Sequence, residues 1–247
     1  MIRSLGEAVS VVAVDQSNTI IAGGWNGTLT SWSNDGDLQW STNLPDRIGD
    51  IAYTERLIFV TSGLHLVAVD RGTGEMIWQK PLEGSADLVF IQEDLVFVTS
   101  SVYDIEYNDF IDSAIWCFDL MGQQIWEQHL SERPWTIMSY DKGIILGLGR
   151  PKMGALAIDS AGVSKPLNLP SSAPVTTGIN HFNEMLFGHS NGDITTLDNL
   201  LFRASTSSID KILICHNGGI YVKSATIFQA FSNDFKLNWC LENTSIS

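Results

Sequence analysis

Cysteine is scarce in this chain, and its placement excludes two ways of stabilising a fold. The sequence has 3 cysteines, Cys117, Cys215 and Cys240. An odd number without C-x-x-C spacing indicates neither a disulfide framework nor a zinc site. We therefore expect three reduced thiols in the core and no structural metal.

Basic residues are also few. Lysine and arginine together number 14 against 28 aspartates and glutamates, which gives a formal net charge of −14 and a pI of about 4.5. Such a field repels phosphate backbones, so binding to nucleic acid by counterion release is not expected. Hydrophobic residues make up 44% of the chain and charged residues 17%, which is typical of a well-packed globular protein.

Long apolar runs and helical periodicity are absent as well. No run approaches the roughly 20 apolar residues of a membrane-spanning helix, so we expect no membrane insertion. No basic, apolar and small-residue leader pattern precedes the first expected strand, which predicts a cytoplasmic protein. No segment of useful length repeats its apolar residues every 3.6 positions, and the fold class is therefore expected to be all-β.

Internal repetition is what the sequence has in abundance. Tryptophans that follow glycine-containing turns recur at 40, 78 and 126, and a fourth lies at 239. Before each turn, an alternating strand ends in an apolar residue followed by Asp or Ser. Further upstream lie short runs rich in β-branched and aromatic residues, at 20–24, 57–62, 95–100, 144–147, 185–188 and 220–222. These runs are typical of central strands.

The spacing of these runs predicts four short strands in each repeat. Repeats of 20 to 50 residues with four strands each are the signature of propeller blades. We predict one β-propeller domain over residues 1–247, with about six four-stranded blades. The predicted blades span about 7–44, 48–82, 85–130, 134–169, 173–205 and 208–242.

The repeat also resembles a known family. The best copy of apolar-x-Asp-x-x-x-Gly-x-x-x-Trp runs through 69–78, and a close copy runs through 118–126. This pattern resembles the tryptophan-docking repeat of PQQ-like and WD-repeat-like β-propellers, and the resemblance covers nearly the whole chain. The aspartate can accept backbone hydrogen bonds in the turn, and the indole is expected to cover the gap between blades. Structural roles of this kind are predicted for Trp40, Asp70, Trp78, Asp119, Trp126, Asp159, Asp198 and Trp239.

Loops at one end of the predicted blades carry arginine and aromatic residues, which often dominate interface energetics. The segment 103–112 is an insertion with three aromatics, and it lacks the glycine and terminal glutamate of a calcium loop. We expect a protruding hairpin within a basic, aromatic rim that binds a protein or peptide. The alternative is that these loops are polar only because they are exposed. The candidate residues are Trp25, Arg47, Tyr103, Tyr107, Phe110, Arg133, Trp135, Arg150 and Lys152.

Enzymatic activity is the competing interpretation, because PQQ-dependent dehydrogenases share the repeat and metal-dependent hydrolases occur on six-bladed propellers. A hydrolase needs carboxylates or histidines that converge on one channel. The candidates on expected inner strands have scattered registers: Asp50, Asp87, His181, Asp210 and His216. The sequence therefore favours a non-catalytic scaffold without a cofactor. A third alternative is a module of a larger assembly, like envelope-protein assembly factors of this repeat type. The missing leader and lipid-attachment cysteine argue against that cellular role, whereas a similar mode of peptide binding stays open. The oligomeric state is not predicted.

Overall fold

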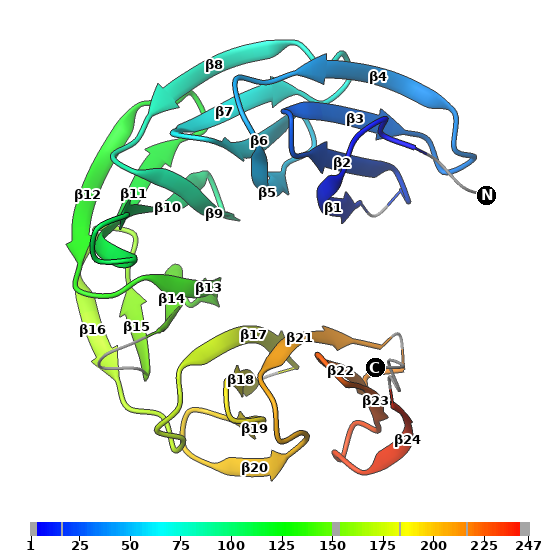
Figure 1. The fold of residues 1–247 in the computed structure, drawn as a ribbon, viewed down its shortest axis with the longest axis vertical. Coiled ribbons are helices and arrows are strands. Elements are labelled where there is room, and N and C mark those ends of the chain that lie inside the picture. Colours follow the sequence, from blue (N-terminus) through cyan, green and yellow to red (C-terminus); the bar gives the residue numbers. More distant parts are fainter. Residues whose placement is uncertain (1–3, 16, 150–153, 183, 216, 243–247) are drawn as a thin grey trace. The chain divides into compact units, whose positions relative to one another are not determined.

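The computed structural model describes residues 4–15, 17–149, 154–182, 184–215 and 217–242, and every regular element in these ranges is a β-strand. The strands form six four-stranded antiparallel sheets, each of which joins four strands in chain order (Figure 1). The prediction of an all-β fold with about six four-stranded blades is confirmed. The chain divides into two compact units, residues 1–131 (unit 1) and 132–247 (unit 2).

Unit 1 contains the first three sheets. The first sheet is β1 (Val9–Val14), β2 (Ile20–Gly24), β3 (Thr28–Trp32) and β4 (Leu38–Asn43). The second is β5 (Ile48–Tyr53), β6 (Leu57–Ser62), β7 (His65–Asp70) and β8 (Met76–Pro81). The third is β9 (Ser85–Gln92), β10 (Leu95–Asp104), β11 (Asp109–Asp119) and β12 (Gln124–Leu130).

Unit 2 contains the other three sheets. The fourth sheet is β13 (Pro134–Tyr140), β14 (Gly143–Leu148), β15 (Gly154–Ile158) and β16 (Ser164–Leu167). The fifth is β17 (Val175–His181), β18 (Glu184–His189), β19 (Asp193–Thr195) and β20 (Leu200–Arg203). The sixth is β21 (Ile209–Ile214), β22 (Ile220–Ser224), β23 (Ile227–Phe231) and β24 (Leu237–Glu242). Each predicted blade contains one of the six sheets, whereas a single domain over the whole chain stays a prediction.

The core lies between neighbouring sheets, because the central strands are buried on both faces. Ile58 and Val60 of β6 pack in a cluster with the first sheet, whereas Phe59 packs in a cluster with the third. Alternate side chains of a strand point to opposite faces, so one run of consecutive apolar residues serves two clusters. In the same way, Leu186 and Phe187 of β18 belong to separate clusters in unit 2.

The four repeat tryptophans occupy equivalent register positions on their outer strands. Each pairs with the residue before a bulge in the third strand of its sheet: Trp40 with Ser31, Trp78 with Ala68, Trp126 with Cys117 and Trp239 with Ala230. The fourth sheet has Lys165 at this position, opposite Ala157. The shared register explains why the tryptophan signal recurs with a blade-like period.

The first two of these indoles dock onto the next sheet. Trp40 Nε1 donates to the carbonyl oxygen of Arg71 at 2.8 Å, and Trp78 Nε1 donates to that of Leu120 at 3.2 Å. A Cβ added at Gly74 would lie 2.6 Å from the Trp40 ring, so the turn needs a glycine there. Trp126 packs on Phe97 of its own sheet, and Trp239 packs on Tyr221 and Phe228 but remains 41% exposed. For Trp126 and Trp239, packing between blades stays a prediction.

The predicted turn aspartates accept backbone hydrogen bonds in three sheets. Asp70 Oδ1 accepts from the N–H groups of Gly72 and Thr73, both at 2.9 Å. In the third and fourth sheets, the Oδ1 atoms of Asp119 and Asp159 accept from the N–H groups two and four residues further along the chain. Such bonds fix the turn that delivers the chain to the outer strand.

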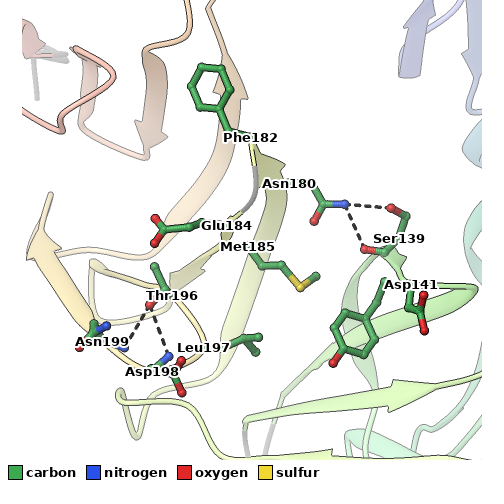
Figure 2. Close-up of a pocket in the computed structure, with 11 residues that line it drawn as sticks. Ser139, Asp141, Asn180, Phe182, Glu184, Met185, Thr196, Leu197, Asp198 and Asn199 are labelled. Carbon is green, nitrogen blue, oxygen red and sulfur yellow. Dashed lines mark hydrogen bonds between the residues drawn. The ribbon is translucent and has the colours of Figure 1, made fainter.

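In the fifth sheet, Thr196 holds this turn position. Its Oγ1 accepts the N–H groups of Asp198 at 3.3 Å and Asn199 at 3.1 Å, and its own N–H donates to the carbonyl oxygen of Asn199. Figure 2 shows both side-chain bonds. The structural role predicted for Asp198 was therefore wrong by two positions, because β19 ends at Thr195 and the turn begins directly after it.

The cysteines are free, but only two lie in the core. Cys117 and Cys215 are buried, whereas Cys240 on β24 is exposed, so the prediction of three core thiols was wrong at that position. Burial raises the pKa of the Cys117 thiol to about 12. Cys117 is therefore protonated and unreactive at neutral pH.

Candidate protein-binding surface

The insertion in the third sheet forms a two-stranded arm. Strand β9 pairs with β10 only as far as Ser101, and β12 pairs with β11 only from Ser113 onward, so residues 102–112 extend beyond the sheet. Tyr103 Oη donates to Asn108 Oδ1 at 2.6 Å, and the Tyr103 and Phe110 rings pack edge-on with centroids 5.2 Å apart. These interactions hold the two strands of the arm together.

The arm exposes an unusual amount of apolar surface for so short a segment. The side chains of Ile105 and Tyr107, at its tip, are 87% and 76% exposed. Tyr103, Phe110 and Ile111 on its flanks are also exposed. Contiguous exposed apolar surface of this kind marks interaction sites more often than single exposed residues do.

Trp25 and Arg47 lie in loops of the first two sheets and contact each other. The Arg47 guanidinium carbon is 4.1 Å from the Trp25 ring centroid, which is a cation–π contact. Trp25 is 52% exposed. Glu7 fixes its loop, because the Glu7 carboxylate accepts the N–H groups of Asn26 and Thr28. The hydrogen bond from Thr28 lowers the pKa of Glu7, so the Glu7 carboxylate that holds this loop is ionised at neutral pH.

Backbone hydrogen bonds join these loops along one edge of unit 1. The N–H of Leu44 donates to the carbonyl oxygen of Gly27, and the N–H of Gly63 donates to that of Arg47. A Cβ added at Gly84 would lie 2.5 Å from the carbonyl oxygen of Ser101, at the base of the arm. We call this edge, with Trp25, Arg47, Leu64 and the arm, the arm edge.

Leu64 is the residue that sequence reasoning missed at the arm edge. It lies in the turn between β6 and β7 and is 53% exposed. A leucine in a tight turn next to Gly63 is the signal that could have found it, since turns favour glycine and small polar residues.

The arm edge is acidic, which corrects the expectation of a basic rim for unit 1. Arg47 is its one lysine or arginine among the described residues. The carboxylates outnumber it because the arm alone contributes four of them. The acidic residues of this edge are Glu7, Asp46, Glu83, Asp104, Glu106, Asp109 and Asp112.

The remaining candidate residues belong to unit 2. The side chain of Trp135 is 39% exposed, and Arg133 beside it is half-buried. Trp135 packs over Gly149, where an added Cβ would lie 3.0 Å from the indole nitrogen. Arg150 and Lys152 lie outside the described residues. A surface that joins these four residues to the arm edge stays a prediction.

Of the two histidines considered for catalysis, the structure describes one, His181, and it makes a structural bond. His181 Nε2 lies 2.6 Å from the carbonyl oxygen of Gly218, and His216 lies outside the described residues. His189 is fully buried, with Nδ1 3.0 Å from the carbonyl oxygen of Ala173 and Nε2 2.9 Å from Thr195 Oγ1. Among the described residues, no three histidine, cysteine or carboxylate side chains are grouped to hold a metal ion.

His189 should make the protein sensitive to mild acid. Burial lowers its pKa below the ordinary value of 6.5, so the folded protein keeps it neutral while the unfolded chain takes up a proton. We expect the free energy of unfolding to fall as pH drops below about 6.5, by at most about 1.4 kcal/mol per pH unit. Urea denaturation between pH 7.5 and 5.5 measures this slope.

The control for this prediction is the His189→Gln variant, which removes the buried imidazole and should flatten the slope. An equal slope in the wild type and His189→Gln would contradict the assignment.

The sheets, their tryptophan docking and the turn bonds define a PQQ-like β-propeller fold. A sequence profile of the family described as outer membrane protein assembly factor BamB matches residues 25–184, and the chain belongs to this PQQ-repeat family. No curated protein matches the chain in sequence. No helix that could span a membrane occurs within the described ranges.

Two solved structures show the same fold at low sequence identity. BamB from Moraxella catarrhalis has 15% identity and a TM-score of 0.68, and the match covers 98% of this chain and 74% of that one. The computationally designed protein Ika8 has 11% identity and a TM-score of 0.64, with 95% and 87% of the two chains covered.

Proposed function

We propose that the protein is a non-catalytic scaffold that binds a protein partner through its arm edge. The observation that carries this proposal is the arm itself, which holds five exposed large apolar side chains on a hairpin that adds nothing to a sheet core. The description of the family as an assembly factor also supports this proposal. An exposed apolar arm is suited to contacts with another protein.

The charge of the arm edge indicates the chemistry of the partner. Four carboxylates are interspersed among the apolar side chains of the arm, and the chain carries a net charge of −14. A segment that combines lysine or arginine with apolar residues complements this pattern, and opposite charge speeds the encounter. The proposed partner therefore has a basic, apolar docking segment.

The arm prediction concerns its two most exposed apolar side chains. Ile105→Ser with Tyr107→Ser should weaken partner binding at least about 10-fold, because exposed aromatic anchors dominate binding energy. Stability should change by less than about 0.5 kcal/mol, since neither side chain is packed. Partners are captured from host extract with the tagged full chain, purified, and rebound to each variant by biolayer interferometry.

The matched control removes two exposed apolar side chains elsewhere in unit 1. Met121→Ser with Ile125→Ser, at positions that are 77% and 49% exposed, should leave binding within two-fold of wild type. Added salt should slow association with the wild type. A purified partner that binds the arm variant as tightly as the wild type would place the docking surface elsewhere. Alcohol or sugar oxidation with added PQQ and Ca²⁺ would contradict the non-catalytic assignment.

A further inference from the structure

Unit 2 contains a pocket that the proposed function does not use. It has a volume of about 500 Å³, within the range of about 300–1,000 Å³ typical of ligand sites. It lies between the fourth and fifth sheets, at the strand ends where β13 meets β14 and β17 meets β18 (Figure 2). The lining residues are Ser139, Tyr140, Asp141, Asn180, Phe182, Glu184, Met185, Thr196, Leu197, Asp198 and Asn199.

The floor of the pocket is apolar and continuous with the core. Met185 and Leu197 pack against the buried cluster of the fourth and fifth sheets, and the half-exposed Tyr140 adds an aromatic ring. Figure 2 shows Met185 extending into the space between Asn180 and Leu197. A floor of this kind accepts methylene groups and the flat face of a planar group.

One polar side chain ties the two sheets of the pocket together. Asn180 Nδ2 donates to the carbonyl oxygen of Ser139 at 3.0 Å and to Ser139 Oγ at 2.8 Å. Because both bonds use the amide nitrogen, the Asn180 oxygen is oriented to accept a hydrogen bond. The wall is thus fixed before any ligand arrives, which lowers the entropy cost of binding.

The charged groups of the pocket are all carboxylates. Asp141 comes from the fourth sheet, whereas Glu184 and Asp198 come from the fifth, and Figure 2 shows them on opposite sides. They form no group that could hold a metal ion. Since the negative charges surround an apolar floor without converging on a point, they suit an extended organic cation better than a divalent ion.

We propose that this pocket binds an arginine side chain from a peptide or protein segment. A guanidinium is planar, weakly hydrated and able to donate to two carboxylates at once, and it stacks on aromatic faces. Its three methylenes would lie on Met185 and Leu197. This inference goes beyond the proposed function, because the pocket lies in unit 2 and involves no residue of the arm edge.

The test follows the Met185 methyl group by NMR in the full-length chain with ¹³C-methyl methionine. The resonance is assigned with Met185→Leu, and the probes are a capped Gly-Arg-Gly tripeptide and its citrulline analogue. The arginine probe should give a saturable shift with an affinity at least 10-fold higher than that of the neutral, nearly isosteric citrulline probe. Ca²⁺ alone should give no saturable shift.

Variants of the carboxylates locate the site. Glu184→Gln with Asp198→Asn should weaken the arginine probe at least 10-fold. Glu55→Gln with Asp94→Asn, which makes the same charge change at exposed positions of unit 1, should stay within two-fold of wild type. If the double variant unfolds, Asp141→Asn replaces it, because the backbone φ of 49° at Asp141 suits asparagine.

Three outcomes would overturn this inference: equal affinity for the citrulline probe, no shift at Met185, or a saturable Ca²⁺ site that displaces arginine. The inference and the proposed function fail separately. Loss of partner binding in the arm variant leaves the Met185 shift intact, and loss of arginine binding in the pocket variant leaves partner docking on the arm intact.

Discussion

Replacing Trp40 by alanine should lower the free energy of unfolding by about 3–5 kcal/mol, the usual cost of removing a large buried aromatic side chain. The indole is 8% exposed and belongs to the core cluster between the first and second sheets. Its Nε1 donor also satisfies the Arg71 carbonyl oxygen. The change therefore creates a cavity and breaks a hydrogen bond between sheets. Urea denaturation followed by far-ultraviolet circular dichroism measures the loss.

Two control variants separate the contribution of the apolar contacts to this loss of stability from that of the hydrogen bond. Trp40→Phe keeps most of the apolar contact and loses the donor, so it should cost distinctly less than alanine. Trp25→Ala removes an exposed indole of the same size and should cost less than about 1 kcal/mol. A loss below about 1 kcal/mol for Trp40→Ala would mean that the indole does not hold the two sheets together.

Replacing Gly192 by alanine should cost about 3 kcal/mol or more, because two separate penalties coincide there. The residue has a φ of 86°, which residues with a Cβ rarely adopt. A Cβ at Gly192 would also lie 1.8 Å from the carbonyl oxygen of Ser205. Because that contact is to backbone, the β18–β19 turn or the segment at 205 has to move. Thermal and urea denaturation of the variant measure this cost.

Gly6 offers the matched control, since it has a similar φ of 82° and no atom within 4 Å of an added Cβ. Gly6→Ala therefore carries the conformational penalty alone, about 1 kcal/mol. The difference between the two variants isolates the steric term. If Gly192→Ala proved no more destabilising than Gly6→Ala, the close approach to Ser205 would be refuted.

The sheets could be predicted from the sequence because two periodic signals agree. Runs such as 57–62 are apolar almost without interruption, which is typical of strands buried on both faces, and the tryptophans mark one register position in four sheets. The fifth sheet lacks the tryptophan, and there the prediction placed the turn residue at Asp198 instead of Thr196. A threonine hydroxyl can accept the same backbone hydrogen bonds as an aspartate carboxylate. The turn therefore keeps these hydrogen bonds, although the sequence no longer shows the aspartate pattern.

The candidate sites were less predictable, because they depend on which loops meet in space. The insertion at 103–112 could be interpreted as an exposed hairpin from its length and aromatics. The net charge of the arm edge was harder to predict, because the rim expected from the sequence combined basic residues of both units, whereas four carboxylates of the insertion lie on the same edge as Arg47. The pocket of unit 2 combines residues as far apart in sequence as Ser139 and Asn199, and nothing local in the sequence brings them together.

Consecutive residues of one central strand belong to different cores, as Ile58 and Phe59 do. Each hydrophobic core in this chain is therefore an interface between two neighbouring sheets. The middle sheet of unit 1, like that of unit 2, contributes one face to each of two such interfaces. A duplicated repeat carries both apolar faces of its sheet, and these faces match those of the neighbouring sheets. A gene could therefore gain or lose a blade without a new core having to evolve. This modularity gives a physical reason why the sequence of a repeat without the tryptophan, such as the fifth sheet, can diverge. The sheet stays in place as long as its two apolar faces still pack against the neighbouring sheets.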